Sequence, residues 1–461
     1  MLQAVLQTID SRRQQCIAAL KEFLSIPSIS TQPAHKPDMQ RCAQWLADQL
    51  SFTGLDVKIM PVASGKGHPA VVAKNKHIPG RPTVLFYGHY DVQPPEPLNL
   101  WTTPPFEPTV RANAIYARGS ADDKGQVWAH VEAIMAWQAH GGLPVNLTLL
   151  VEGEEEIGSE NLADFIRAHR DDLRADVAVI SDSTQFARGI PAITYCLRGL
   201  IYMELTITAA SHDLHSGLYG GAVPNPINVL CELLATLHDR DGRVNIPGYY
   251  DKVIPPTAEE RLMWAKLPFD EKQFAAELKL PGLSGEVGYS ALERLWARPT
   301  CDINGITGGY EGPGAKTVIA STASAKVSMR LVPEQDPVAL RDAFAEAMRQ
   351  RCPKCVALEM VCHGQTPAVM ISTHSVAVDL ASEAIEAGFG TRPALVRAGA
   401  SIPVVELIKS NLGIDTLLVG FGLPDDCVHS PNEKFDLDAL QAGSRTAAVL
   451  YDRLARLEPK H

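Results

Sequence analysis

Short, wholly apolar segments alternate with amphipathic segments through the first 200 residues of this chain. The apolar segments cover residues 83–87, 147–151 and 177–180. Each is flanked by turn-forming residues, as buried parallel strands are. Helical periodicity separates them, over residues 38–52, 123–138 and 159–169, with Ser159 as the N-cap of the last helix. The alternation predicts an α/β domain whose mostly parallel sheet is flanked by helices.

The same pattern returns near the C-terminus, where the sequence predicts helices over 375–386 and 404–410 and a strand over 416–419. The middle of the chain differs. Its expected order is a strand at 200–208, a helix at 226–238, strands within 317–332, a helix at 337–351 and a strand at 356–362. The order β-α-β-β-α-β is typical of a ferredoxin-like α+β unit. We therefore expect a split catalytic domain, 1–198 and 366–461, with an inserted lid and dimerisation domain at 199–365. Residues 239–300 receive no assignment.

Charge and cysteine usage narrow the class of protein. The 461 residues carry a net charge of −11, and the basic residues form no cluster, so we expect neither nucleic acid nor a membrane surface as a partner. The apolar runs fall far short of the ~20 residues that a spanning helix needs. Arg12, Arg13 and Lys21 interrupt the N-terminal segment where a signal peptide would be apolar. Nine scattered cysteines favour a reducing, cytoplasmic location.

Polar clusters follow the predicted strands. His89 and Asp91 follow the first, the acidic run 152–156 the second, and Asp182 the third, while His429 lies in the loop after the strand at 416–419. A further loop, 119–125, carries Asp122 and leads into a helix. Ligand sites of open α/β sheets lie at the carboxyl ends of the strands, so we expect these clusters to converge.

Imidazole and carboxylate groups together suit Zn²⁺, Co²⁺ or Mn²⁺. So many acids indicate two divalent cations, because several carboxylates are needed to balance their charge. Asp91 lies two residues beyond His89, where it can accept the far N–H of the imidazole. Of the adjacent Glu155 and Glu156, one can bind metal while the other handles a proton.

Five motifs then occur in order: GHYDVQP at 88–94, ARGSADDKG at 117–125, EGEEEIGS at 152–159, DLHSGLYGG at 213–221 and HSPNEKF at 429–435. They resemble those of the di-zinc metallopeptidase family of carnosinase-type dipeptidases, peptidase V, glutamate carboxypeptidase, aminoacylase and acetylornithine deacetylase. The resemblance spans nearly the whole chain and is closest to the branch of carnosinase and cytosolic nonspecific dipeptidase.

The resemblance implies a role for each site residue. Glu155 resembles the general base and Asp91 the acid that supports a ligand, while His215 resembles a residue that reaches across a homodimer to stabilise the oxyanion. The implied ligands of the two metal ions are His89, Asp122, Glu156, Asp182 and His429, with Asp122 bridging. Arg330 and Ser401 resemble residues that hold the substrate carboxylate.

The resemblance therefore implies that a bridging hydroxide, with Glu155 as base, hydrolyses the amide bond of a dipeptide or small peptide with a free C-terminal carboxylate. One position departs from the pattern. Relatives usually carry an acid where this chain has Ala398, and that acid would suit a substrate ammonium group. An N-acyl amino acid is thus an alternative substrate. A second alternative is a catalytically silent metal-binding protein, although the ligands and Glu155 are all present.

Overall fold

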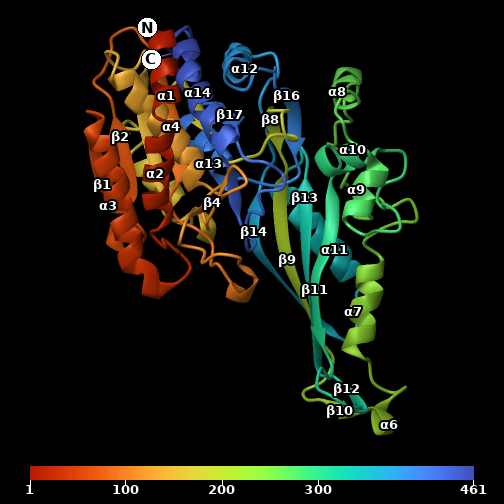
Figure 1. The fold of residues 1–461 in the computed structure, drawn as a ribbon. Coiled ribbons are helices and arrows are strands. Elements are labelled where there is room, and N and C mark those ends of the chain that lie inside the picture. The colour runs from red at the N-terminus through yellow and green to blue at the C-terminus, as the bar shows by residue number, and fades with distance from the viewer. Residues whose placement is uncertain (461) are drawn as a thin grey trace. The chain divides into compact units, whose positions relative to one another are not determined.

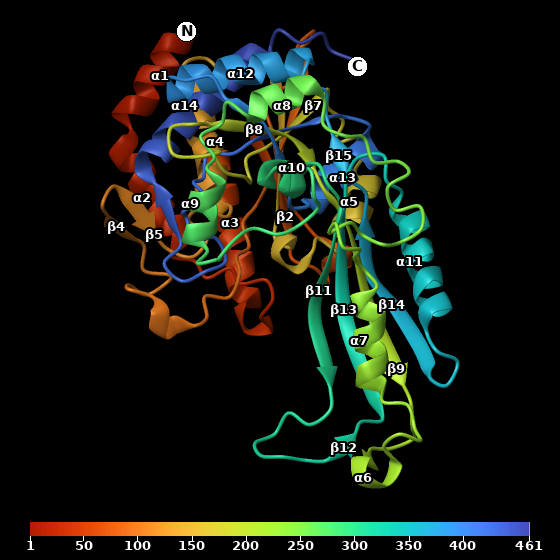
Figure 2. The ribbon, with the colours of Figure 1, turned by 90° about the vertical axis from the view of Figure 1, so that its right-hand side faces the viewer.

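The computed structural model describes residues 1–460, which form two compact units. The first unit comprises residues 1–195, 371–396 and 403 onward, and the second comprises residues 196–370 and 397–402. Figures 1 and 2 show both units as ribbons from two directions. The chain therefore passes from the first unit to the second and back, with a second short excursion at 397–402.

A large sheet forms the centre of the first unit. Its strand order begins β1 (Asp56–Met60), β2 (Ala70–Lys74), β6 (Asn146–Glu152), β3 (Thr83–His89), β7 (Val177–Ile180), β17 (Thr416–Val419) and β8 (Ala192–Leu197), and β16 (Ala394–Ala398) also pairs with β8. The central strands β6, β3, β7 and β17 are parallel, whereas the margins are antiparallel. Every residue of β6, β7 and β17 is buried, as expected for strands covered on both faces.

Helices cover this sheet and extend the core. They are α1 (Leu2–Ser11), α2 (Arg13–Leu24), α3 (Lys36–Phe52), α4 (Lys124–Gln138), α5 (Leu162–Ala168), α12 (Val376–Phe389), α13 (Pro403–Leu412) and α14 (Leu437–Leu454). Helix α4 packs on β3, α3 on β1 and β2, and α12 and α13 on β17. Thirteen residues of α4 are buried because α1, α2 and α14 also pack against it.

Short elements complete the first unit. A small sheet has the order β18 (Lys434–Asp436), β5 (Ala114–Tyr116) and β4 (Thr109–Arg111). Single 3₁₀ turns are η1 (Pro33–His35), η2 (Ala63–Gly65), η3 (Leu98–Leu100) and η4 (Glu155–Ile157). The prediction that Ser159 caps a helix is wrong. Helix α5 begins at Leu162 with Asn161 at the N-cap position, because the Ser159 hydroxyl instead donates a hydrogen bond to the buried carboxylate of Glu152 at 2.8 Å.

The second unit contains a ferredoxin-like arrangement. Its elements follow the order β9 (Gly199–Thr208), α7 (Pro226–Ala235), β11 (Thr300–Gly308), β13 (Thr322–Leu331), α11 (Pro337–Arg351) and β14 (Ala357–Thr366). The sheet order is β11-β13-β9-β14, with every pair antiparallel. Strand β15 (Val369–Met370) pairs with the last two residues of β8. The predicted fold class, an α/β domain with an inserted ferredoxin-like α+β domain, is confirmed.

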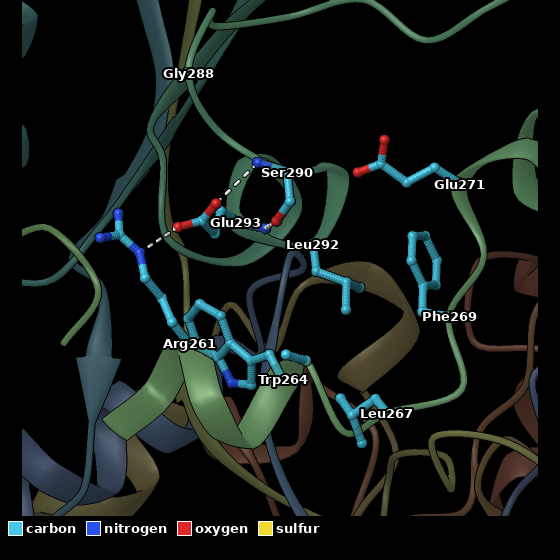
Figure 3. Close-up of a pocket in the computed structure, with 10 residues that line it drawn as sticks. Arg261, Trp264, Leu267, Phe269, Glu271, Gly288, Ser290, Leu292 and Glu293 are labelled. Carbon is cyan, nitrogen blue, oxygen red and sulfur yellow. Dashed lines mark hydrogen bonds and ion pairs between the residues drawn. The ribbon is translucent and has the colours of Figure 1, made fainter. Parts of the chain in front are cut away.

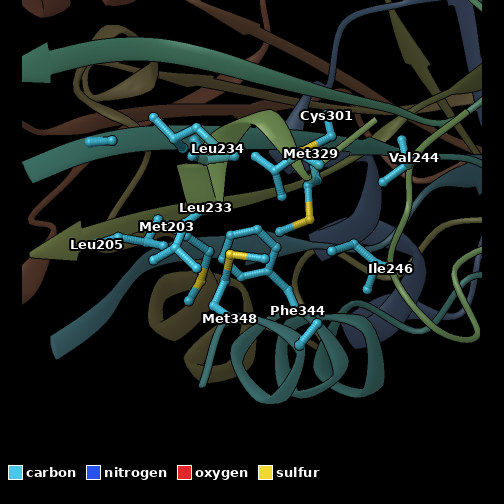
Figure 4. Close-up of a cluster of buried hydrophobic side chains, with 14 of the residues drawn as sticks. Met203, Leu205, Leu233, Leu234, Val244, Ile246, Cys301, Met329, Phe344 and Met348 are labelled. Atoms are coloured by element: carbon cyan, nitrogen blue, oxygen red, sulfur yellow. The ribbon is translucent and has the colours of Figure 1, made fainter. Parts of the chain in front are cut away.

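One face of this sheet is buried. Alternate residues of β9 are buried, which is the pattern of a strand covered on a single face. Helices α7 and α11 pack on that face. Between them and the sheet lies a cluster of apolar side chains that includes Met203, Leu233, Met329, Phe344 and Met348 (Figure 4). This core gives the second unit a hydrophobic centre of its own.

Residues 239–300, which received no prediction, contain three short helices: α8 (Ala258–Trp264), α9 (Glu271–Glu277) and α10 (Ala291–Trp296). At one end of the four-stranded sheet lie β10 (Leu214–His215), α6 (Ser216–Tyr219) and β12 (Val318–Ile319), as both views show (Figures 1 and 2). In the described part of the chain, no helix has the length and apolar character needed to cross a membrane.

Candidate metal centre

The parallel strands of the first unit bring the predicted clusters to one edge of the sheet. Strand β3 runs parallel to both β6 and β7, so their carboxyl ends coincide. His89 is the last residue of β3, Glu155 and Glu156 lie in η4 directly after β6, and Asp182 follows β7. The expected convergence of these loops is therefore seen in the structure.

Two groups of ligand-type side chains lie at this edge. The first consists of His89, Asp122 and Asp182, and the second of Asp122, Glu156 and His429. Within each group the candidate ligand atoms all lie within 4.8 Å of one another. Asp122 belongs to both groups, which is the arrangement that a carboxylate bridging two metal ions requires.

The distances fit divalent cations. Nε2 of His89 lies 3.0 Å from Oδ1 of Asp122 and 3.9 Å from Oδ2 of Asp182. Nε2 of His429 lies 2.9 Å from Oδ2 of Asp122 and 3.3 Å from Oε2 of Glu156. Two ligands on a tetrahedral zinc ion are about 3.4 Å apart, given bonds of about 2.1 Å. The observed separations bracket that value, and each oxygen of Asp122 faces a different histidine.

Outer contacts orient these ligands. Nδ1 of His89 lies 3.1 Å from the main-chain oxygen of Asp91 and 3.3 Å from its Oδ1. The main-chain N–H of Glu156 donates to Oδ2 of Asp91 at 3.0 Å. Gln93, to which the sequence analysis gave no role, donates from Nε2 to Oε2 of Glu156 at 2.7 Å. Asp91 thus contacts one residue of each ligand group.

The electrostatics show a surplus of negative charge. Burial, followed by the charge of Asp122, raises the pKa of Asp182 to about 7. Hydrogen bonds to Asp122 and Glu156 raise the pKa of His429 to about 10. Burial opposes the ionisation of Asp122, but the bonds from His429 and His89 outweigh it and lower the pKa of Asp122. A site that draws protons onto its histidines in this way also suits divalent cations, which bind the same groups without protons.

Glu155 differs from its neighbour Glu156. Within residues 1–460 its carboxylate has no hydrogen-bond partner, whereas Glu156 is held by Gln93. Burial raises the pKa of Glu155 to about 8, together with the negative charges of Asp182 and Glu156 and against the charge of His89. Glu155 is therefore electrostatically coupled to both ligand groups and free to exchange a proton.

Arg330 and Ser401 meet in the second unit. Nη1 of Arg330 donates to Oγ of Ser401 at 3.1 Å, and the Ser401 hydroxyl donates to the main-chain oxygen of Arg198. Burial lowers the pKa of Arg330, and burial followed by the charge of Arg330 lowers that of Arg198 to about 10. Among the described residues, neither arginine has a carboxylate within ion-pair distance. This positive site suits an anion.

His215 also belongs to the second unit, whereas the ligand groups belong to the first. It is exposed and stands at the N-cap of α6, where its Nδ1 accepts a hydrogen bond from the N–H of Gly217 at 3.0 Å. Because Nδ1 accepts, the neutral ring carries its proton on Nε2 and presents an N–H donor to solvent. Ala398, the position of the departure, is the last residue of β16.

Figure 3 shows a separate pocket of about 440 Å³ in the second unit, lined by residues of the 239–300 segment. Trp264, Phe269 and Leu292 give it apolar walls. Its acids are already engaged, since Glu293 pairs with Arg261 and Glu271 accepts from a main-chain N–H. None of its lining residues is a histidine or cysteine, so it lacks the chemistry of the ligand groups.

The sequence comparisons decide the family. The model of peptidase family M20/M25/M40 matches residues 85–453. The chain belongs to this family. The predicted resemblance is thus confirmed, and the chain is a hydrolase of the metallopeptidase class.

Individual relatives match over nearly their full length. The human "Beta-Ala-His dipeptidase" is 31% identical over 99% of this chain and 93% of its own. The "Cys-Gly metallodipeptidase DUG1" of Candida albicans is 32% identical over 96% of each chain. The solved structure of an M20 family metallo-carboxypeptidase from Sulfolobus solfataricus superposes with a TM-score of 0.86 at 32% identity, covering 96% of this chain and 99% of that one.

Proposed function

We propose that this protein is a dipeptidase that uses two divalent metal ions to hydrolyse an amide bond next to a free carboxylate. The observation that carries the proposal is the position of Asp122 between the two ligand groups. The names of the relatives, a Beta-Ala-His dipeptidase and a Cys-Gly metallodipeptidase, support dipeptides as the substrate class.

His89, Asp122 and Asp182 would hold one ion, and Asp122, Glu156 and His429 the other. Divalent cations at these positions would polarise the scissile carbonyl and lower the pKa of the attacking water. Zinc suits the donor set, and manganese and cobalt bind the same ligand types.

Glu155 would move the proton. Its carboxylate has no competing hydrogen bond within residues 1–460, and its raised pKa of about 8 suits exchange near neutral pH. Glu155 takes a proton from the water as the C–O bond forms, and returns it to the leaving nitrogen as the C–N bond breaks. Asp91 supports this step only indirectly, by holding the ring of His89 through Nδ1.

Substrate binding would involve the second unit. The guanidinium of Arg330, which lacks a carboxylate partner, would bind the C-terminal carboxylate of the substrate, with Ser401 beside it. The exposed Nε2–H of His215 would donate to the oxyanion in a partner subunit, which makes the inserted unit the lid and dimerisation domain of a homodimer. The absence of disulfides among the nine cysteines supports a cytoplasmic location.

The second candidate function is hydrolysis of N-acyl amino acids. It is favoured by Ala398, because a methyl group stands where an acid would bind a substrate ammonium group. Purified protein should be assayed with zinc or manganese, before and after chelation, on free dipeptides and their N-acylated counterparts. Metal-dependent cleavage of the free dipeptides is the expected result. Cleavage of the acylated set alone would establish the second candidate, and cleavage of neither would refute both.

A further inference from the structure

Glu433 connects the two segments that carry the shared ligand and the last ligand. It lies four residues beyond His429 in the HSPNEKF motif, and its side chain is completely buried. Its position in the sequence predicts no role for it. Its contacts lie on the opposite segment, more than 300 residues away in sequence.

Both carboxylate oxygens of Glu433 accept hydrogen bonds from the loop that leads to Asp122. Oε1 accepts from the main-chain N–H groups of Ala121 and Asp122, at 2.9 and 3.2 Å. Oε2 accepts from the N–H of Gly119 at 2.9 Å and from Nη1 of Arg118 at 2.8 Å. One side chain therefore accepts hydrogen bonds from three main-chain N–H groups of this loop and from a buried guanidinium.

The loop is shaped to close around this carboxylate. Gly119 has φ of 84°, a conformation that glycine adopts without steric cost. A Cβ at Gly119 would lie 2.6 Å from Cγ1 of Val92, so no other residue fits there without displacement. The turn that points the N–H groups at Glu433 thus depends on this glycine.

The segment of His429 is also fixed by the residue next to Glu433. Asn432, next to Glu433, accepts from the N–H of Thr102 at 2.8 Å and donates to the oxygen of Leu100 at 2.8 Å. His429 itself has φ of 61° and a half-exposed side chain. The histidine is therefore held at the base of its loop as well as by the contacts of its ring with Asp122 and Glu156.

We propose that Glu433 is the positioning residue of the metal centre, which sets Asp122 opposite His429 before any ion binds. The inference rests on the proposed function in that it takes these residues as ligands. The buried carboxylate of Glu433 accepts a hydrogen bond from the main-chain N–H of Asp122. Protein contacts therefore set the distance between the ligand atoms of Asp122 and His429.

The test replaces Glu433 by glutamine, which keeps the size but puts an NH₂ group against two of the four donors. We expect the dissociation constant for Zn²⁺, measured by competition with a chromophoric chelator, to rise about 10–100-fold. The absorption of bound Co²⁺ should change with it. Glu286→Gln is the matched control. Glu286 is also buried and pairs with Arg298 through both oxygens, but it lies in the second unit.

Glu286→Gln should leave the zinc affinity unchanged, even if it lowers the melting temperature as much as Glu433→Gln does. A folded Glu433→Gln protein whose zinc affinity is within about threefold of wild type, set against the 10–100-fold expected of an outer-shell change, would overturn the inference. If the wild-type protein itself binds no zinc at these residues, the proposed function fails instead.

A measurement without any variant covers the case in which Glu433→Gln does not fold. In metal-free wild-type protein, the amides of Gly119, Ala121 and Asp122 should exchange with deuterium at least about 100-fold more slowly than free amides. Protection that appears only after zinc is added would mean that the ion, and not Glu433, orders the loop, and would overturn the inference.

Discussion

Oδ2 of Asp122 lies 2.9 Å from Nε2 of His429, although the two residues are more than 300 positions apart in sequence. The other oxygen of Asp122 faces His89 at 3.0 Å. Asp122 is thus shared by two groups of ligands, whereas His429 belongs to one. Substitution of the two residues should therefore have different effects on metal content.

The variants Asp122→Asn and His429→Ala test this difference. We expect His429→Ala to keep about one ion per chain, because it impairs a single ligand group. Asp122→Asn should keep less, because it impairs both groups. Hydrolysis should fall more than about 100-fold in each, since even outer-shell changes cost 10–100-fold. Elemental analysis after dialysis measures the ions. His35→Ala is the control, because His35 pairs with Asp38 outside both groups. Full metal content in Asp122→Asn would contradict the shared role.

Glu155→Gln separates proton transfer from metal binding. The variant keeps the shape of the side chain and removes its basicity, so kcat should fall about 10²–10⁴-fold. Metal content should stay at the wild-type level, because Glu155 belongs to neither ligand group. The exposed Glu160 supplies the control, Glu160→Gln, which should behave as wild type. A kcat within a few-fold of wild type would remove Glu155 from the proton-transfer role.

The metal centre was largely predictable because its ligands follow strands whose apolar runs are plain in the sequence. Strand β7 and strand β17 have the predicted bounds, 177–180 and 416–419. The order of the strands then brings the ligands together, because neighbouring parallel strands end at the same edge of the sheet. The role of Glu433 could not be predicted, because nothing in the neighbouring sequence distinguishes a buried carboxylate that binds a distant loop from a solvated one.

In the 239–300 segment, the starts of two helices could have been predicted from the sequence. Thr257 with Glu260, and Ser290 with Glu293, form capping boxes at the starts of α8 and α10. The helices have only seven and six residues, which is too short for periodicity to stand out.

The inclusion of residues 397–402 in the second unit has no comparable signal. It depends on contacts between distant segments, such as the 2.8 Å bond from Nε of Arg198 to the oxygen of Gly399. Neither residue lies in a sequence pattern that predicts this contact. The excursion of this loop could be seen only in three dimensions.

Arg330→Gln should weaken the binding of substrates that carry a free carboxylate. Loss of a charge-assisted contact should lower kcat/KM about 10–100-fold for a dipeptide, mainly through KM. The corresponding dipeptide amide, which lacks the charge, should be cleaved equally by both proteins. Arg341→Gln on α11 is the control, because Arg341 pairs with Asp342 at the surface. Equal losses on acid and amide substrates would show that Arg330 acts on structure rather than on the carboxylate.

Ser401→Ala should have a smaller effect than Arg330→Gln. The Ser401 hydroxyl already gives its proton to the main-chain oxygen of Arg198 and accepts from Arg330, so it orients the guanidinium. We expect kcat/KM to fall about 3–10-fold, the range of one hydrogen bond, because the guanidinium itself is kept. A loss as large as that of Arg330→Gln would instead indicate a direct bond from Ser401 to the substrate.

Metal binding should release protons, and the release should depend on pH. In metal-free protein the pKa of His429 is raised to about 10 by Asp122 and Glu156, and that of His89 is raised well above its usual value, as its bonds to Asp122 and Asp91 outweigh burial. Both rings are therefore protonated at pH 7.5 and must lose a proton to bind an ion.

We expect at least two protons to leave per chain when zinc fills the site at pH 7.5, about one from each ring. The number should fall as the pH rises above about 10, where His429 has already lost its proton. Titration calorimetry in buffers of different ionisation enthalpy measures the release. His429→Ala should lower it by about one proton, because one of the two charged rings is gone. The His35→Ala control should not change it, since His35 is absent from both ligand groups. A release that is the same for wild type and His429→Ala would show that His429 is not a ligand.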